Sequence, residues 1–256
     1  LSEDCFNYVY KNIKKNVHLA SISGGTDIVS CFVLGNLYQS VHSGEIQCKG
    51  LGMDVRVFNE KGKTILNKKG ELVCVNPFPS MPLKFWNDPN DTKFKQAYFN
   101  KYKNVWHHGD YAKITKNKGF VIYGRSDTTL NPGGVRLGTA EIYSEIERFN
   151  EIKESLVVGQ SWDNDIRIVL FVILNPKYQL NELLLKNLKL QIRKNASPRH
   201  VPHKIIQVKD IPRTKSGKIV ELAVKNIIEG NKIRNKEALA NPESLNEFKN
   251  LEELKF

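Results

Sequence analysis

The chain lacks a hydrophobic run long enough to cross a membrane as a helix, for which about 18 uninterrupted apolar residues are needed. Its most apolar stretch, residues 19–37, is interrupted by Ser21, Ser23, Thr26, Asp27 and Asn36. No basic segment followed by an apolar one resembles a signal peptide, and the first residue is Leu1. We therefore expect no membrane attachment, and a chain that is a piece of a longer protein.

Cysteine is also scarce. The four cysteines are Cys5, Cys31, Cys48 and Cys74, and no two of them form a C-x-x-C pair. This spacing excludes a zinc knuckle and a dense disulfide framework, because both need closely spaced cysteines. We expect reduced thiols, as is usual in the cytosol.

Positive charge, in contrast, is abundant. The chain has 39 Lys and Arg against 27 Asp and Glu, a net charge of +12 in 256 residues. Much of the excess lies in residues 176–230, where two interpretations remain open: a solvated basic face, or a surface that meets phosphate groups. A nucleic-acid-binding module is disfavoured, because the segment lacks the interleaved aromatic residues that favour single-strand binding.

The hydrophobic pattern changes along the chain from mainly β to alternating strand and helix, which predicts an α+β fold. With 40% hydrophobic residues, the chain can form one or two domains. Strands are expected at residues 17–22, 45–49, 53–58, 71–75, 111–115, 119–123, 155–159, 166–174 and 204–208. The first is expected to run into a loop at 23–27, and the strands at 111–115 and 119–123 are expected to form a hairpin. Helices are expected at 139–149, where Thr139 could be the N-cap, at 180–194, where the pattern is amphipathic, and at 219–229. The composition changes at 124–129, which suggests a domain boundary, and residues 231–256 are typical of a polar tail with some helical character.

Two glycine-containing segments of the first half carry groups that could bind a nucleotide. In the Gly-Gly-Thr-Asp segment 24–27, the glycines let the backbone approach a ligand, Thr26 could donate to a phosphate oxygen, and Asp27 could hold a divalent cation. Asp110 follows a glycine at the start of an expected strand, where its carboxylate could accept two ribose hydroxyl protons. Each segment alone could equally be a solvated turn. Metal binding by the adjacent His107 and His108 is not expected, because no partner has a suitable spacing.

Two further segments combine glycine with a cation. Arg125 in Gly-Arg-x-Asp and Arg136 in Gly-Gly-Val-Arg could make forked hydrogen bonds with phosphate or ribose oxygens, or could be surface arginines beside a hinge. Residues 211–219 end in Ser-Gly-Lys but do not form a P-loop, because Pro212 stands where that motif needs glycine. What remains is a mobile cationic loop whose Lys218 could stabilise a transferring phosphoryl or acyl-phosphate group.

In this order and at about these separations, the four segments resemble the later core motifs of the adenylate-forming superfamily, which includes acyl-CoA synthetases, luciferases and nonribosomal adenylation domains. Longer phrases are similar to the acetoacetyl-CoA synthetase family: SGGTDI (23–28), GEIQCKGLGM (44–53), GRSDTTLNPGGVRLGTAEIY (124–143) and SGKIVELAVKNIIEG (216–230). The resemblance covers nearly the whole chain, including Asn-Pro-Glu-Ser-Leu in the tail. It implies that residues 1–125 are the β-rich end of a large AMP-binding domain, 126–230 a small mobile α+β domain, and 231–256 a tail.

The resemblance further implies two half-reactions. Acetoacetate and MgATP would give acetoacetyl-AMP and pyrophosphate, and the thiol of coenzyme A would then displace AMP. The roles implied for the nucleotide are α-phosphate contact by Gly25 and Thr26, a Mg²⁺ contact by Asp27, ribose contacts by Asp110 and Arg125, and catalysis of adenylation by Lys218. The roles implied for the second step are a hinge at Asp127, the pantetheine tunnel at Gly134, phosphate contact by Arg136 and a coenzyme A contact by Arg193.

Three departures from the family pattern stand out. Asp27 replaces a common Glu, and Thr128 replaces a common acid after the hinge position. The phosphate-gripping loop that ends in Lys is absent, and the adenine-packing segment and most of the acid pocket are expected before Leu1. We therefore expect the fragment alone to be inactive. Another short-chain acyl-CoA synthetase, or an inactive truncated product, remain alternatives.

For the complete enzyme, the resemblance implies a cytosolic ligase of lipid or sterol synthesis. Its partners would be the small molecules acetoacetate, ATP and coenzyme A, with no nucleic acid, membrane or obligate protein partner.

Overall fold

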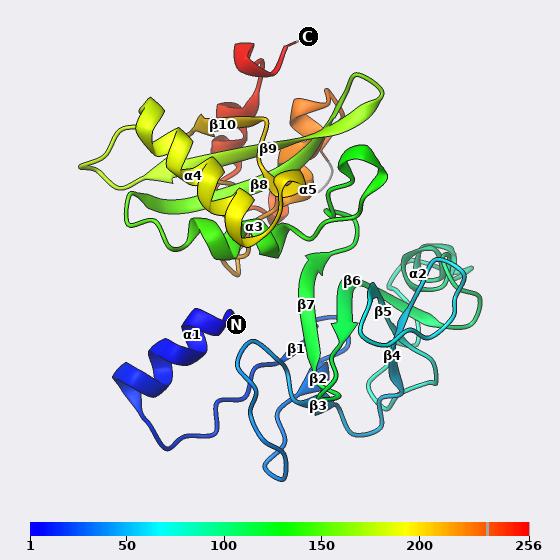
Figure 1. The fold of residues 1–256 in the computed structure, drawn as a ribbon. Helices are drawn as coiled ribbons and strands as arrows, with labels where there is room; N and C mark the ends of the chain where they lie inside the picture. Colours follow the sequence, from blue (N-terminus) through cyan, green and yellow to red (C-terminus); the bar gives the residue numbers. More distant parts are fainter. Residues whose placement is uncertain (234–235, 256) are drawn as a thin grey trace. The chain divides into compact units, whose positions relative to one another are not determined.

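The computed structural model describes residues 1–233 and 236–255; residues 234, 235 and 256 of the predicted tail lie outside the described residues. The chain divides into two compact units, Leu1–Ser126 and Asp127–Phe256 (Figure 1). The division falls within residues 124–129, where the composition changes. Each unit has its own hydrophobic core.

The first unit is built on two antiparallel sheets, with the strand orders β4-β5-β6-β7 and β1-β2-β3. The strands are β1 (Ser23–Gly25), β2 (Ser30–Leu34), β3 (Cys48–Lys49), β4 (Val55–Phe58), β5 (Lys69–Cys74), β6 (Trp106–Ile114) and β7 (Phe120–Arg125). The helices are α1 (Glu3–Tyr8), which continues as a π-helical turn (Val9–Ile13), and α2 (Thr92–Tyr98). The predicted hairpin of β6 and β7 is confirmed: its turn is closed by the amide of Thr115, which donates to the Gly119 carbonyl at 2.9 Å.

Aromatic side chains attach α2 to the larger sheet. The Trp106 ring, at the start of β6, stacks on Tyr98 with a centroid distance of 3.7 Å. Phe78 and Phe94 pack edge-on against the same indole. Because Trp106 is 2% exposed, these contacts fix α2, and with it the Tyr98 hydroxyl, relative to β6.

The second unit has one three-stranded sheet of order β10-β9-β8, in which β8 and β9 are antiparallel and β10 is parallel to β9. The strands are β8 (Ile152–Trp162), β9 (Asp165–Leu174) and β10 (Lys204–Gln207). The helices are α3 (Thr139–Ile146), α4 (Glu182–Asn195) and α5 (Glu221–Ile228), with 3-10 turns at Pro132–Gly134, Pro198–His200, Lys236–Ala238, Pro242–Phe248 and Glu252–Leu254.

Both faces of this sheet are covered, which explains the long apolar runs of β8 and β9. Successive side chains point to opposite faces: Leu170 packs with the apolar stripe of α3 and α4, whereas Phe171 packs with α5 and the C-terminal residues. Figure 1 shows α3 and α4 on one side of the sheet and α5 on the other. The stripe of α4 is Leu184, Leu188 and Ile192, spaced four residues apart.

Most of the expected elements are present, and the α+β fold class is confirmed. The strand expected at residues 17–22 is wrong: this segment pairs with no strand among the described residues, and Val17 and Ile22 are exposed. The loop expected after it contains β1 instead. Thr139 was expected to cap α3, but the N-cap is Gly138, whose amide donates to the Glu141 side chain at 3.2 Å.

The residues predicted to form a polar tail pack into the second unit. We call residues 236–255 the C-terminal segment. Its apolar side chains Leu239, Leu245, Phe248 and Leu254 are buried, and the Phe248 ring lies edge-on to Phe171 at 4.9 Å. Although the C-terminal segment is polar in composition, a few of its apolar side chains belong to the core of the second unit.

The sequence predicted neither a membrane-spanning helix nor a dense disulfide framework. In the described part of the chain, no helix is long and apolar enough to span a bilayer. All four cysteines lie in that part and none of them is paired.

Candidate functional site

The Thr26 and Asp27 side chains lie in the tight turn that joins β1 to β2. The turn is closed by the amide of Ile28, which donates to the Gly25 carbonyl at 3.3 Å. The Tyr98 hydroxyl of α2 donates to Oδ2 of Asp27 at 2.6 Å. Burial raises the pKa of Tyr98, and the bond to Asp27 raises it further, so the phenol is neutral and holds the carboxylate in place.

Gly25 is required by the space around this turn. A Cβ at this position would lie 2.0 Å from Oδ1 of Asp27 and 2.8 Å from Cε1 of His108. His108 is buried on β6 with its ring edge-on to Phe32. Burial lowers the pKa of His108, against the opposing effect of Asp110 and Asp27. The turn therefore packs directly on a neutral imidazole.

Asp110 and Arg125 face each other on paired strands. They are register partners in β6 and β7, with Nη1 of Arg125 3.3 Å from Oδ1 of Asp110. The same nitrogen donates to the His108 carbonyl at 2.9 Å. Gly109 has φ +82°, and a Cβ there would come within 2.7 Å of Nη2 of Arg125. The pair offers acceptors and forked donors side by side, a set that suits neighbouring hydroxyl groups.

The residues on both sides of Asp127 are tied to carboxylates of their own units. The Ser126 hydroxyl donates to Glu71, which is 2% exposed and also holds Lys101 at 2.5 Å and His107 at 3.0 Å. On the other side, the Thr128 hydroxyl donates to Glu221 of α5.

Glu221 also accepts a hydrogen bond from the Tyr143 hydroxyl. The oxygen of that hydroxyl accepts in turn from the Val157 amide at 3.0 Å. Burial raises the pKa of Glu221, and hydrogen bonds from Tyr143, Thr128 and Thr139 partly offset this. Both neighbours of Asp127 thus have firm local attachments.

The loop that contains Gly134 and Arg136 is closed at its base by two hydrogen bonds between Leu130 and Leu137. In its middle, the Gly133 amide donates to both carboxylate oxygens of Asp165, each at 2.9 Å. Gly134 has φ +74° and lines a hollow beside the turn that joins β8 to β9. Nε of Arg136 donates to Oγ1 of Thr129 at 3.1 Å.

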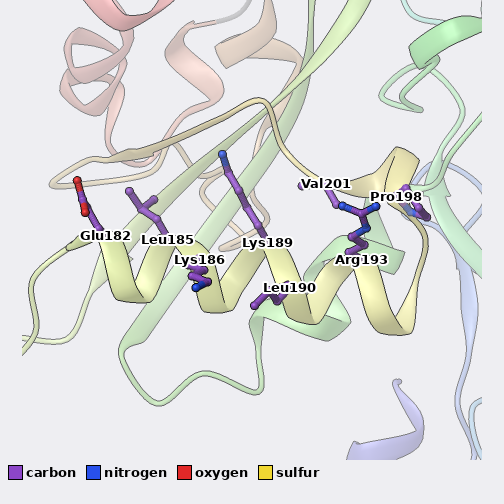
Figure 2. A pocket seen from close by; sticks show the side chains of 8 residues that line it. All are labelled: Glu182, Leu185, Lys186, Lys189, Leu190, Arg193, Pro198 and Val201. Atoms are coloured by element: carbon purple, nitrogen blue, oxygen red, sulfur yellow. The ribbon is translucent and has the colours of Figure 1, made fainter.

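Arg193 belongs to a basic groove along the exposed side of α4. The groove has a volume of about 560 Å³ and is lined by Glu182, Leu185, Lys186, Lys189, Leu190, Arg193, Pro198 and Val201. Figure 2 shows Lys189 and Arg193 projecting from the same side of the helix, with Val201 above that side and Pro198 near the C-terminal end of the helix. Leucine side chains beside cations suit a ligand that combines an apolar part with phosphates.

Lys218 is exposed near the tip of a short hairpin-like loop. The Thr214 amide donates to the Lys218 carbonyl at 2.8 Å, and the Gly217 amide to the Thr214 carbonyl at 2.8 Å. Arg213 pairs with Glu154 of β8 and donates to the Gly217 carbonyl at 2.9 Å. The loop was expected to be mobile. In the structure its base is attached to the sheet of the second unit, because Arg213 forms an ion pair with Glu154.

The chain is similar to known proteins along its whole length. Residues 141–218 match the AMP-binding enzyme C-terminal domain family. The chain is 59% identical over 255 residues to an acetoacetyl-coenzyme A synthetase of Rhizobium meliloti (strain 1021), an alignment that covers 100% of this chain and 39% of that protein. It is 49% identical over 256 residues to an acetoacetyl-CoA synthetase of Xenopus tropicalis, with 99% and 38% coverage. The chain is a relative of the acetoacetyl-CoA synthetases.

A solved structure supports the relationship. Acetoacetyl-CoA synthetase from Streptomyces lividans superposes with a TM-score of 0.90 at 40% identity, covering 97% of this chain and 38% of that one. The chain thus spans about 38–39% of the length of these synthetases. The resemblance to acetoacetyl-CoA synthetases that the sequence motifs indicated is confirmed.

Relative to this synthetase family, the structure gathers some of the expected site residues and separates others. In the first unit, Gly25, Asp27, Asp110 and Arg125 surround His108. In the second unit, Gly134, Arg193 and Lys218 lie on three different elements.

The sequence analysis missed Tyr98, Glu71 and Asn241, whose side chains hold site segments in place. A tyrosine in a short helix that the sequence analysis did not predict carries no signal of such a role. A glutamate in a strand and an asparagine in the tail carry none either.

The groups around Asp27 decide whether it could be a metal ligand. Across residues 1–233 and 236–255, no group of three or more His, Cys, Asp or Glu side chains could hold a metal ion. Mg²⁺ commonly uses only one or two carboxylates together with substrate phosphates and water. The exposed Asp27 carboxylate, oriented by Tyr98, fits that limited requirement.

Proposed function

We propose that the chain supplies the C-terminal portion of an AMP-forming acetoacetate–CoA ligase. The observation that carries this proposal is the 59% identity to a named acetoacetyl-coenzyme A synthetase along the whole chain. The complete enzyme activates acetoacetate with ATP to acetoacetyl-AMP and pyrophosphate, and coenzyme A then displaces AMP to give the thioester.

In the first half-reaction, the first unit binds the nucleotide. The Asp110 carboxylate accepts from the ribose hydroxyls, and the Arg125 guanidinium donates to their oxygens; their pairing across β6 and β7 supports this assignment. Gly25 and Thr26 approach the α-phosphate from the β1–β2 turn. Asp27 holds Mg²⁺, which supplies charge neutralisation to the phosphates when it is bound.

The second unit brings the catalytic cation. Negative charge builds up on the α-phosphorus during adenylation, and the Lys218 ammonium group stabilises it best when its position is set in advance. The exposed position of Lys218 at the end of an anchored loop supports this role.

In the second half-reaction, the second unit binds coenzyme A. Arg193 and the α4 groove hold the nucleotide end, Gly134 lines the path of the pantetheine arm, and Arg136 contacts phosphates. The groove combines cations with leucine side chains, as such a ligand requires. Asp127 is the hinge between the steps, which is supported by the local attachments of Ser126 and Thr128 on either side of it.

The wider setting follows from the same proposal. Small molecules are the partners: acetoacetate, ATP and coenzyme A. The enzyme works in the cytosol in lipid or sterol synthesis, without nucleic acid, membrane or an obligate protein partner. Specificity for acetoacetate over another short acid is the part of the proposal that depends most on the named relatives.

The roles of Lys218 and Asp127 can be separated by single-turnover assays in a complete synthetase that contains this sequence. Lys218→Ala is expected to slow acyl-AMP formation by roughly 10²- to 10³-fold, the usual effect of losing one preorganised donor. Thioester formation from supplied acetoacetyl-AMP should change little. Lys215→Ala is the matched control, because Lys215 is an exposed cation of the same loop.

Asp127→Pro is expected to show the reverse pattern, because a fixed φ hinders rotation at the hinge while leaving the adenylation arrangement accessible. Equal losses in both half-reactions for Lys218→Ala and Asp127→Pro would mean that these residues only support the fold, and the proposed roles would be withdrawn.

A further inference from the structure

The C-terminal segment runs along the outer edge of the loop at residues 211–219, which we call the Lys218 loop. Thr214 and Leu239 form an antiparallel bridge. The Ala240 amide donates to the Arg213 carbonyl at 2.8 Å, and the Lys215 amide to the Ala238 carbonyl at 3.2 Å. Residues 213–215 are thus paired on one side with the end of their own loop and on the other with the C-terminal segment.

One side chain adds three further bonds at the point where the loop begins. Nδ2 of Asn241 donates to Oδ2 of Asp210 at 2.6 Å and to the Ile211 carbonyl at 2.9 Å, while its Oδ1 accepts from the Arg213 amide at 2.8 Å. The amide thus joins one carboxylate, one carbonyl and one N–H group. Of the common side chains of this size only an amide matches them, because a carboxylate cannot donate and an aliphatic group can do neither.

Asn241 is itself held firmly. Its carbonyl accepts from the Ser244 hydroxyl at 2.7 Å, and the 3-10 turn Pro242–Phe248 follows directly. Leu245 and Phe248 of that turn are 3% and 1% exposed, so the turn is part of the core. The asparagine therefore connects the start of the Lys218 loop to a rigid element rather than to a free chain end.

We propose that Asn241 is a positioning residue for Lys218, which it orients by bracing residues 210–213. The inference rests on the proposed role of Lys218 in adenylation. Asn241 does not touch the reacting atoms; it limits the motion of the segment that carries the lysine. Adenylation, which needs a preplaced cation, depends on this brace, whereas thioester formation does not.

The brace is tested first in the 256-residue chain by amide hydrogen exchange. Asn241→Asp removes both donated bonds and places a second carboxylate against Asp210. The amides of Arg213, Gly217 and Lys218 should then exchange roughly five- to tenfold faster for each bond lost, with little change in β8 and β9. Asn246→Asp is the matched control, since Asn246 is an exposed asparagine of the same segment.

A swapped pair provides the rescue. In Asp210→Asn combined with Asn241→Asp, the new amide at 210 can donate to the new carboxylate at 241 and still accept from the Ile211 amide, as Oδ1 of Asp210 does at 2.8 Å. The bond to the Ile211 carbonyl stays lost, so one of the two donated bonds is restored. Exchange in the loop should return toward that of the unsubstituted chain. Exchange in the double variant as fast as in Asn241→Asp alone, or unchanged exchange in Asn241→Asp, would overturn the bracing role.

The catalytic consequence is measured in a complete synthetase by the same half-reaction assays. Asn241→Asp should slow acyl-AMP formation at least about tenfold, since a group displaced by an ångström can lose as much as a hundredfold. Thioester formation from supplied acyl-AMP should be unaffected, and the swapped pair should recover part of the lost adenylation rate.

Two failures are distinguishable. If Lys218→Ala slows adenylation but Asn241→Asp does not, the positioning inference is wrong while the proposed function stands. If Lys218→Ala has no effect, the proposed role of Lys218 is wrong and the positioning inference falls with it, whatever hydrogen exchange shows of the brace.

Discussion

Large apolar side chains are covered very differently in the two units. In the first, Val29, Tyr38, Leu51, Leu83 and Trp86 are each 88–97% exposed. In the second, the most exposed large apolar side chain of the described residues is Leu183, at 67%, and both faces of the sheet are covered. The second unit therefore has the organisation of a self-sufficient domain, whereas the first presents apolar surface that a self-sufficient domain would cover.

The candidate site residues show the opposite contrast. Asp110 and Arg125 lie on paired strands and are held by buried neighbours, so the first unit sets their geometry before a ligand arrives. Lys218 and Arg193 are exposed, on a loop and on a helix surface of the second unit. The less complete unit thus carries the better ordered part of the site. A stable scaffold and a preorganised site are separate properties of a fold.

The largest expected effect tests the difference in how the two units cover their apolar side chains. Phe248→Ala should lower the free energy of unfolding by about 3–5 kcal/mol, because it empties a core position between α5 and Phe171. Trp86→Ala, a larger truncation at an exposed site of the first unit, should change it by less than about 0.5 kcal/mol. Urea titrations followed by circular dichroism measure both. Similar losses would mean that the apolar residues of the first unit are covered in solution.

An intermediate effect tests the preorganised pair. In a complete synthetase, Asp110→Asn should raise the KM for ATP by roughly 10- to 100-fold, since a hydrogen bond to a charged group contributes about 1.5–3 kcal/mol. Asp163→Asn, in the turn between β8 and β9, is the control at an exposed carboxylate. An unchanged KM for Asp110→Asn would show that the pair with Arg125 is structural only.

The smallest effect concerns the buried imidazole under the β1–β2 turn. Burial lowers the pKa of His108, so the unfolded chain, with a pKa near 6.5, binds this proton more readily than the folded one. The resulting stability is fully present above about pH 6.5 and is lost as pH falls from there through the folded pKa. An NMR titration of the His108 ring should give a value below that of an unfolded histidine.

His108→Asn should remove this part of the pH dependence in urea titrations between about pH 7.5 and 5.5. His42→Asn, at an exposed site, is the control. An unchanged pH profile for His108→Asn would mean that the imidazole is protonated equally in both states.

Much of the architecture could be predicted from local patterns. An amphipathic pattern predicted α4, and alternation around a turn predicted the β6–β7 hairpin, because the period of the pattern reports directly on which face is buried. The pattern failed at 17–22, where alternating residues have no partner strand among the described residues. Alternation indicates that a segment could pair; a neighbouring strand decides whether it does.

The candidate site divides in the same way. The sequence by itself determined the resemblance to acetoacetyl-CoA synthetases and the identity of the motif residues, because the order and spacing of motifs can be seen without coordinates. Tertiary structure alone decided how those residues are held: Tyr98 against Asp27, Glu71 against Ser126 and Asn241 against residues 210–213. Each of these bonds joins positions that are far apart in the chain, and only packing brings such groups within hydrogen-bond distance.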